Sequence, residues 1–180
     1  MKKPSKFLAP AVLQEAAEQV ASLAKNQAVL AALLGDYAMQ LYGSDRLTGD
    51  LAFASESWIL GLKRGKELTF GGAQTTADNG VPVDIILRDD DDEALYTEAV
   101  NLATRIPESG IRLVRPEHLA AIKMAARRPK DDLDLDFLIL EPGLLDVTKT
   151  KQIVRRFLGS YALQEFQARV DEALWRASRA

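Results

Sequence analysis

Two aspartates stand beside or inside apolar segments that have the composition of β-strands. Asp50 directly precedes the apolar residues 51–54, and Asp84 interrupts the segment VPVDIIL at residues 81–87. A carboxylate buried without a partner costs free energy, so each aspartate needs a partner or a ligand. If the two strands are neighbours, both carboxylates meet at the edge of the sheet and can bind one ligand. Carboxylate oxygens are hard ligands for Mg²⁺, and Mg²⁺ neutralises phosphate charge in phosphoryl transfer. We therefore predict that Asp50 and Asp84 are catalytic residues that bind Mg²⁺ or Mn²⁺.

The residues before Asp50 have the layout of a strand, a glycine turn and a short helix. The apolar run 28–34 ends at Gly35, and a segment with helical spacing follows and ends at Gly43. Such a turn offers backbone N–H groups to phosphate, and a glycine there lets the ligand approach closely. Gly35 is therefore a candidate nucleotide-binding residue. Arg46 can contact a substrate or pair with a carboxylate of the site, and both interpretations stay open.

Periodic patterns predict the elements that must position these residues. Apolar residues at steps of three and four predict an amphipathic helix over residues 10–25. An antiparallel hairpin that carries Asp84 is expected over residues 67–88, because the sequence DNG at 78–80 is a strong turn signal. The glycine pair at 71–72 indicates a bulge or a kink in its first strand.

The second half of the chain is predicted to be mostly helical. A short strand is expected at 111–114, and Gly159 is expected to be a hinge. The expected helices span residues 93–104, 115–129, 131–140, 146–158 and 161–178. The fold class is therefore α/β (α+β), with four or five strands in a mixed sheet, helices packed on it and a C-terminal helical extension. We expect a core over residues 1–143 and an extension over residues 144–180.

Three segments together resemble the polymerase-beta-like nucleotidyltransferase superfamily. GDYAMQLYGSDRLTGDLAFAS resembles its phosphate-binding and metal-binding segment, and NGVPVDIIL resembles the strand that carries its third carboxylate. RPEHLAAIKMAARRPKDDLDLDFLI resembles the helix pair that follows. The three segments occur in the family order within about residues 28–140. The closest likeness is to small bacterial members that include abortive-infection toxins.

The resemblance implies transfer of a nucleoside monophosphate from an NTP to a hydroxyl on RNA, protein or a small molecule. It implies metal binding by Asp50 and Asp84, with Mg²⁺ or Mn²⁺ as the cofactor. The nucleotide-binding residues that it implies are Gly35, Arg46, Thr48, Lys123 and Arg127. A role as the toxin of a toxin–antitoxin pair is one expectation. The alternative is a catalytically degenerate member that binds a nucleotide or a protein.

Two residues depart from the family pattern and motivate that alternative. The second Asp of the Asp-x-Asp pair is replaced by Ala52, on the face of the strand that should hold the metal. Asp36 follows Gly35, and its charge would repel phosphate if it faced the ligand. Glu56 shares the strand face of Asp50, but lies roughly 20 Å away along an extended strand, so we do not expect it to replace the missing ligand.

Composition restricts the remaining possibilities. The net charge of −3 shows no overall basic footprint for nucleic acid, and no apolar run approaches the ~18 residues of a membrane span. The chain has no cysteine, which is compatible with the expected cytoplasmic location. His118, the only histidine, is expected at the surface. The helices after Asp146 are a candidate surface for a protein partner or a homodimer.

Overall fold

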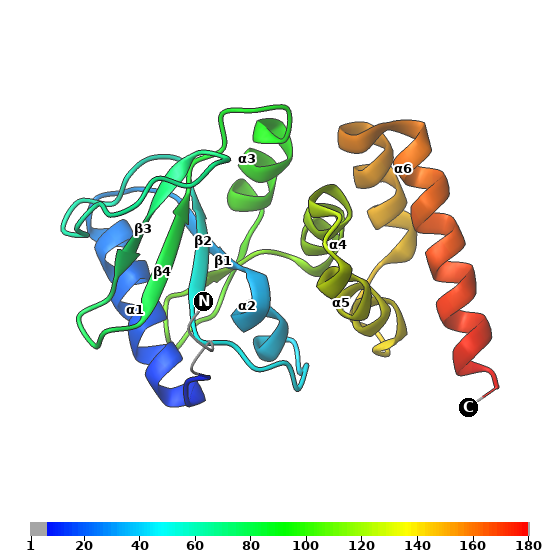
Figure 1. The fold of residues 1–180 in the computed structure, drawn as a ribbon, viewed down its shortest axis with the longest axis horizontal. Helices are drawn as coiled ribbons and strands as arrows, with labels where there is room; N and C mark the ends of the chain where they lie inside the picture. Colours follow the sequence, from blue (N-terminus) through cyan, green and yellow to red (C-terminus); the bar gives the residue numbers. More distant parts are fainter. Residues whose placement is uncertain (1–6, 180) are drawn as a thin grey trace, which may run out of the picture. The chain divides into compact units, whose positions relative to one another are not determined.

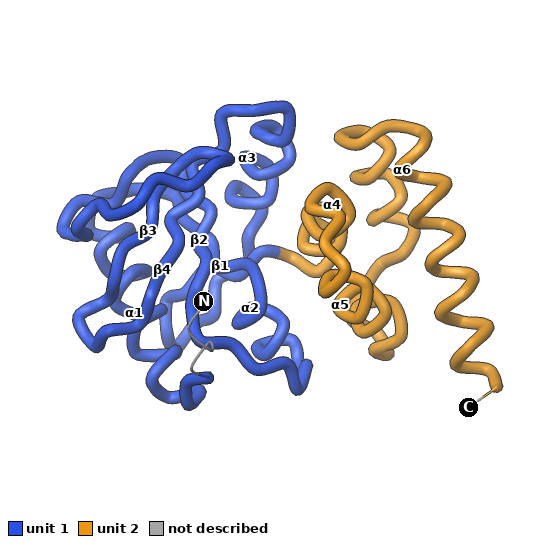
Figure 2. The backbone as a smooth tube through the Cα atoms, in the orientation of Figure 1, with its two compact units in different colours: residues 1–114 blue, residues 115–180 orange. Residues whose placement is uncertain are grey.

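A computed structural model describes residues 7–179, which form two compact units. Unit 1 extends to Val114 and contains the sheet, and unit 2 begins at Arg115 and is helical (Figure 2). The sequence predicts a core that ends at residue 143 and an extension that begins at residue 144. The contacts divide the chain after Val114, because α4 (Pro116–Ala126) and α5 (Pro129–Leu140) pack on α6 (Val147–Ala177).

Unit 1 is built on a six-stranded mixed sheet with the strand order β3-β4-β2-β1-β6-β5. The strands are β1 (Ala31–Leu34), β2 (Leu51–Ser55), β3 (Gly72–Thr76), β4 (Pro82–Ile86), β5 (Thr104–Arg105) and β6 (Arg112–Leu113). The central pair, β2 and β4, is parallel, whereas β1 and β3 run antiparallel to their neighbours β2 and β4. The predicted mixed sheet with packed helices is therefore confirmed.

Helices cover both faces of this sheet (Figure 1). They are α1 (Pro10–Asn26) on one face, and α2 (Gly35–Leu41) and α3 (Glu93–Asn101) on the other. Because side chains alternate along a strand, Phe53 and Ile85 lie on one face of the sheet, and Ala52 and Asp84 lie on the other face. Phe53 and Ile85 are fully buried, and so are Leu13 and Val20 of α1. The face that carries Asp84 is therefore the face of α2 and α3.

The predicted hairpin forms, but its first strand is shorter than expected. Residues 68–71 make a turn in which the Gly71 N–H donates to the Leu68 carbonyl, so β3 begins only at Gly72. Gly72 has φ +90°, and a Cβ atom there would lie 2.0 Å from the Ile85 carbonyl oxygen. Only glycine allows β3 and β4 to approach this closely, which explains the kink that the sequence indicated.

Unit 2 contains the predicted helices with modified ends. The backbone of Gly159, with φ 87° and ψ −178°, breaks α6 at the expected hinge. His118, which the sequence placed at the surface, is only 1% exposed in α4. The prediction was wrong because one element's pattern does not show which of its faces packs against α6. In unit 1, α3 ends at Asn101 instead of residue 104, where β5 begins.

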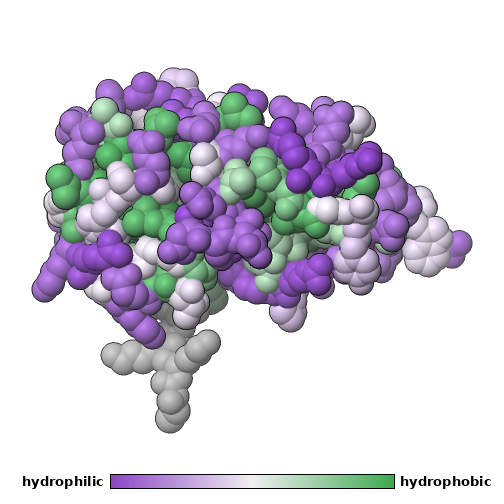
Figure 3. All heavy atoms as spheres, turned by 90° about the horizontal axis from the view of Figure 1, so that it is seen from above, coloured by the Kyte–Doolittle hydropathy of each residue, from purple (hydrophilic) through white to green (hydrophobic). Residues whose placement is uncertain are grey.

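The surface is mainly hydrophilic on the face that Figure 3 draws, with hydrophobic residues between the polar ones. No helix within residues 7–179 is long and apolar enough to cross a membrane.

Candidate functional site

The register of two parallel strands places Asp84 beside the position of the missing carboxylate. Ala52 of β2 is the direct neighbour of Asp84 of β4. Neighbouring positions in a parallel pair lie on the same face, about 4.8 Å apart. The condition on which the sequence argument depends, that the strands next to Asp50 and around Asp84 are neighbours, is therefore met.

Asp50 is held at the entrance to β2 by a local hydrogen bond. The buried Thr48 hydroxyl donates to Asp50 Oδ1 at 2.9 Å and also contacts the Asp50 backbone. The hydroxyl of Thr48, a residue predicted to bind nucleotide, is engaged with Asp50 in this arrangement, and the binding role stays a prediction. The contact restrains an exposed carboxylate directly before the start of β2.

The environment of Asp84 disfavours its charged form. Burial raises the pKa of Asp84, and the nearby charge of Asp50 raises it further, while a hydrogen bond from Gln74 opposes both effects. Gln74 is the cross-strand neighbour of Asp84 on β3. A divalent cation between the two carboxylates would relieve their repulsion, so this donor pair fits a hard metal ion such as Mg²⁺.

The turn at the start of α2 packs directly against the substituted position. Gly35 has φ +79°, and a Cβ atom there would lie 3.4 Å from the Ala52 Cβ atom. The neighbouring Asp36 carboxylate lies 3.4 Å from Arg46 Nε. Arg46 therefore pairs with a carboxylate, which was one of the two interpretations left open, and it offsets the charge of Asp36.

The described chain lacks the third acid. Within residues 7–179, no three His, Cys, Asp or Glu side chains form a group that could hold a metal ion. Glu56 does not replace Ala52: it follows the end of β2, and its Oε1 accepts a hydrogen bond from the Leu30 N–H at 2.7 Å. The residues present fit one cation between Asp50 and Asp84, and they do not supply the three carboxylates of the family pattern.

Lys123 in unit 2 is enclosed by carboxylates. It is 3% exposed, and its Nζ atom contacts Asp134 Oδ2 and lies 3.3 Å from Asp131 Oδ1. Arg128 adds two further hydrogen bonds to Asp131, of 2.8 and 3.0 Å. Lys123 was predicted to bind nucleotide, but its ammonium group is surrounded within this network. A buried ion pair with additional hydrogen bonds joins α4 to α5.

The ionisation of Asp131 depends on this network. Burial by itself would raise its pKa, but the hydrogen bond from Arg128 and the charges of Lys123 and Arg128 outweigh burial. The net effect lowers the pKa of Asp131, so the carboxylate stays ionised.

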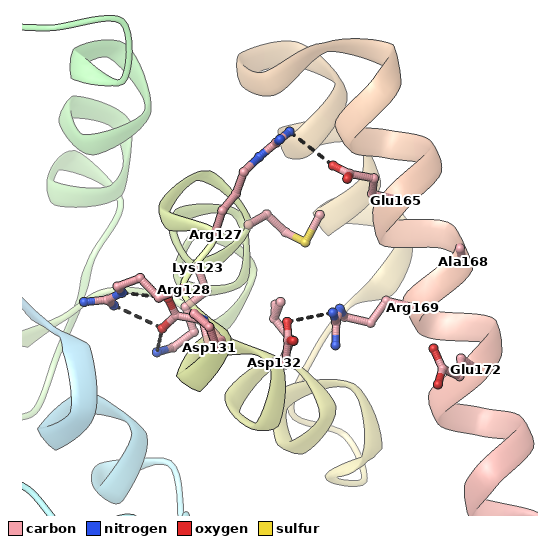
Figure 4. Close-up of a pocket in the computed structure, with 12 residues that line it drawn as sticks. Lys123, Arg127, Arg128, Asp131, Asp132, Glu165, Ala168, Arg169 and Glu172 are labelled. Atoms are coloured by element: carbon pink, nitrogen blue, oxygen red, sulfur yellow. Dashed lines mark hydrogen bonds and ion pairs between the residues drawn. The ribbon is translucent and has the colours of Figure 1, made fainter.

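Arg127 caps the end of α4, one turn after Lys123, and lines a groove of about 530 Å³ between α4, α5 and α6 (Figure 4). Its NH2 atom lies 3.2 Å from Glu165 Oε2, and its side chain is 62% exposed. Across the same groove Arg169 contacts Asp132 at 2.7 Å. The acidic and basic groups of the groove therefore offset one another.

Sequence reasoning missed Gln74 and Arg128. Gln74 can be found by counting from the hairpin turn, since Thr76 pairs with Pro82 and Gln74 with Asp84. The Lys123 network has a weaker signal, because acids and bases at these spacings also occur on solvated helical faces.

The sheet and its helices have the fold of a solved nucleotidyltransferase-like protein. A crystal structure of an antigenic nucleotidyltransferase-like protein from Paracoccidioides brasiliensis aligns over 97% of this chain and 94% of its own, with a TM-score of 0.53 and 14% identity. A candidate nucleotidyltransferase from H. pylori aligns over 96% and 98%, at 15% identity and a TM-score of 0.48. The antibiotic-resistance factor ANT(2'')-Ia aligns over 95% and 97%, at 12% identity and a TM-score of 0.47.

At these identities the likeness concerns the fold alone. No family model matches the sequence. The search of curated proteins also found no match.

Proposed function

We propose that this protein binds a nucleoside triphosphate with Mg²⁺ or Mn²⁺ and transfers its nucleoside monophosphate to a hydroxyl acceptor. The observation that carries the proposal is the position of Asp84 in β4 beside Ala52 in β2. Asp50 directly precedes β2. A bound divalent cation supplies charge neutralisation for the phosphates and activation of the attacking hydroxyl. In this reaction the hydroxyl oxygen bonds to the α-phosphorus, pyrophosphate leaves and the hydroxyl proton passes to solvent.

The residues of unit 1 receive distinct roles in this proposal. Asp50 and Asp84 hold the cation, and Thr48 orients Asp50 through its 2.9 Å hydrogen bond. Gly35 gives the triphosphate access to the backbone beside Ala52. Arg46 contacts phosphate after it exchanges the Asp36 carboxylate for the ligand, because both partners are anions that compete for one guanidinium group.

The residues of unit 2 divide into positioning and contact roles. Lys123 keeps α4 and α5 of unit 2 together through its two carboxylates, so its role is to position these helices. Arg127, which is exposed and held by a single surface ion pair, is the candidate for phosphate contact. The acceptor classes remain RNA, protein and small molecules, and the toxin setting remains part of the proposal on resemblance alone.

The second candidate function is nucleotide or protein binding without transfer. The missing third carboxylate at Ala52 favours it, because a two-metal site needs more ligands than Asp50 and Asp84 provide. Ala52 lies on the face that should hold the metal, so Ala52→Asp should restore a third ligand to an otherwise intact scaffold.

Transfer of label from radiolabelled NTPs, with Mg²⁺ or Mn²⁺, tests the first candidate. Wild-type protein should label an RNA, protein or small-molecule fraction, and Asp50→Ala and Asp84→Asn should abolish the labelling. Asp45→Asn, an exposed acid near the site, is the matched control and should leave labelling unchanged. If the wild type transfers nothing while NTP with Mg²⁺ raises its melting temperature, the second candidate replaces the first. If neither effect occurs, transfer and nucleotide binding both fail, and only protein binding is left of the second candidate.

A further inference from the structure

A second cavity lies on the same sheet face as Asp84. It has a volume of about 210 Å³ and is enclosed by β2, β4 and α3, all within unit 1. Ala54 and Ile86, neighbours in the parallel pair, form its floor. One face of α3 forms its wall, with Glu93, Tyr96, Thr97, Val100 and Asn101. These residues recur at steps of three, one, three and one, which is one stripe of a helix.

The cavity is adjacent to the candidate metal ligands. Ala54 follows Ala52 by two residues, and Ile86 follows Asp84 by two residues in the neighbouring strand. Residues two apart in a strand share a face and lie about 7 Å apart. A small molecule in the cavity can therefore extend a group to Asp84 along the sheet.

The charges around the cavity favour a cationic ligand. Two carboxylates, Glu56 and Glu93, line it, and the one basic side chain in the lining is Arg88. The Arg88 guanidinium is bound by Asp90 at 2.8 Å and by Asp92 at 2.5 Å, and it lies over the rings of Phe70 and Tyr96. Because Asp90 and Asp92 already offset the charge of Arg88, the lining carboxylates Glu56 and Glu93 leave the cavity negative.

The two lining carboxylates differ in how they are held. Glu56 Oε1 accepts the Leu30 N–H at 2.7 Å, which fixes the side chain at the end of β2. Glu93 is exposed in the first turn of α3. Thr97 and Asn101, also exposed, add a hydroxyl and an amide to the wall. These groups suit an ammonium group accompanied by hydroxyls.

We propose that this cavity binds a small organic amine in its protonated form, with the ammonium group between Glu56 and Glu93. The volume fits a single six-membered ring. The assignment of this amine as one end of the hydroxyl acceptor rests on the proposed function, since it uses the short path from the cavity to Asp84. An anionic group such as a triphosphate is disfavoured here, which separates this subsite from the NTP.

Three ring compounds of equal size test the charge preference: cyclohexylammonium, cyclohexanol and cyclohexanecarboxylate. Each is titrated into the full-length protein without metal or NTP, and backbone amide shifts are followed by NMR. Cyclohexylammonium should shift signals of residues 54–56 and 93–101, with millimolar affinity that weakens as salt increases. Cyclohexanol should bind at least about tenfold more weakly, and cyclohexanecarboxylate should produce no shifts in this region.

Glu93→Gln and Glu56→Gln should each weaken cyclohexylammonium binding about three- to tenfold. Glu56→Gln keeps an oxygen that can accept the Leu30 N–H, so the fold around β2 is preserved. Asp91→Asn removes an exposed acid two residues from Glu93, outside the lining, and should bind like the wild type. Equal binding of all three compounds, equal loss in Asp91→Asn, or shifts confined to other residues would overturn the proposal.

This measurement is independent of catalysis. Failure of the amine to bind removes the subsite and leaves the result of the NTP transfer assay unaffected. Failure of transfer removes the proposed reaction and leaves the amine-binding result unaffected.

Discussion

At the scale of single residues, the fold raises the pKa of the Asp84 carboxyl group. The negative charge of Asp84 therefore does not stabilise the fold. Burial is the main cause, and the charge of Asp50 adds to it. A carboxyl group with a higher pKa in the folded than in the unfolded state destabilises the fold once it is ionised. This penalty is absent below the unfolded pKa and fully present above the folded pKa. Such a cost is expected of a group retained for a ligand.

Asp84→Asn should therefore raise the melting temperature at pH 7. A domain of this size gains about 2–4 °C for each kcal/mol. The difference from wild type should shrink as the pH falls and vanish below about pH 3.9, the ordinary pKa of an aspartate. Thermal unfolding followed by circular dichroism from pH 3 to pH 8 measures it, with Asp45→Asn as a control that should show no such dependence. A lower melting temperature for Asp84→Asn at pH 7 would contradict this account.

The charge of Lys123, unlike that of Asp84, stabilises the fold, because it neutralises two buried carboxylates. Lys123→Met leaves Asp131 and Asp134 buried without their cation, and loss of one partner of a buried ion pair costs about 3–5 kcal/mol. Lys130→Met, on the exposed surface of α5, should cost no more than about 1 kcal/mol. Urea unfolding of the two variants measures the difference. Equal stabilities would show that the network contributes nothing.

Asp131 makes the same network sensitive to acid. Its pKa is lowered in the folded state, so its contribution is present above the unfolded pKa and is lost as the pH falls through the folded pKa. Asp131→Asn should therefore lower the stability at pH 7 and approach the wild type at pH 2. Urea midpoints at both pH values test this prediction, and a constant difference between the two proteins would argue against it.

At the scale of elements, the β3–β4 hairpin positions Asp84 and Gln74 opposite one another. This register depends on Gly72, whose added Cβ atom would meet the Ile85 carbonyl oxygen at 2.0 Å. Gly80 in the turn has a similar φ of +86°, but a Cβ atom there meets nothing within 4 Å. Alanine substitutions at the two positions can therefore be compared. Both carry the cost of a left-handed backbone, but only the substitution at Gly72 adds the cost of a steric clash.

Gly72→Ala should destabilise unit 1 by more than about 4 kcal/mol, a size that single substitutions reach only through a specific steric or electrostatic defect. Gly80→Ala should cost about 1 kcal/mol, the ordinary cost of a left-handed alanine. Denaturant unfolding compares the two variants. If they prove equally stable, the close approach of β3 to β4 is not what requires Gly72.

At the scale of the whole molecule, the chain forms two compact units, each with its own packing. Each unit contains one of the two tryptophans, Trp58 in unit 1 and Trp175 in unit 2. Single-tryptophan variants, Trp175→Phe and Trp58→Phe, therefore allow fluorescence to follow the unfolding of each unit separately.

Lys123→Met should move the transition reported by Trp175 and leave the transition reported by Trp58 within about 0.5 kcal/mol. Asp84→Asn should move the transition reported by Trp58 and leave the transition reported by Trp175 unchanged to the same extent. Each substitution is made in both single-tryptophan backgrounds, and equal shifts of both transitions would show that the units unfold as one.

The sequence by itself determined which segments form the elements, and it placed Asp50 and Asp84 on strands that prove to be neighbours. Periodicity and turn residues suffice for this, because they record which side chains share a face within one element. The resemblance to the nucleotidyltransferase pattern, and not periodicity, implied that Ala52 replaces a metal ligand. The roles of these residues in binding and catalysis stay predictions.

Only the tertiary structure decided what those faces pack against. It buried Lys123 between Asp131 and Asp134, buried His118, and paired Arg46 with Asp36. These contacts join residues of different elements, and a charged residue has the same local pattern whether it faces solvent or a partner from another element. The sequence from Gly35 to Ala52 therefore predicts a nucleotide site, whereas the partners of its charged residues depend on how the fold packs.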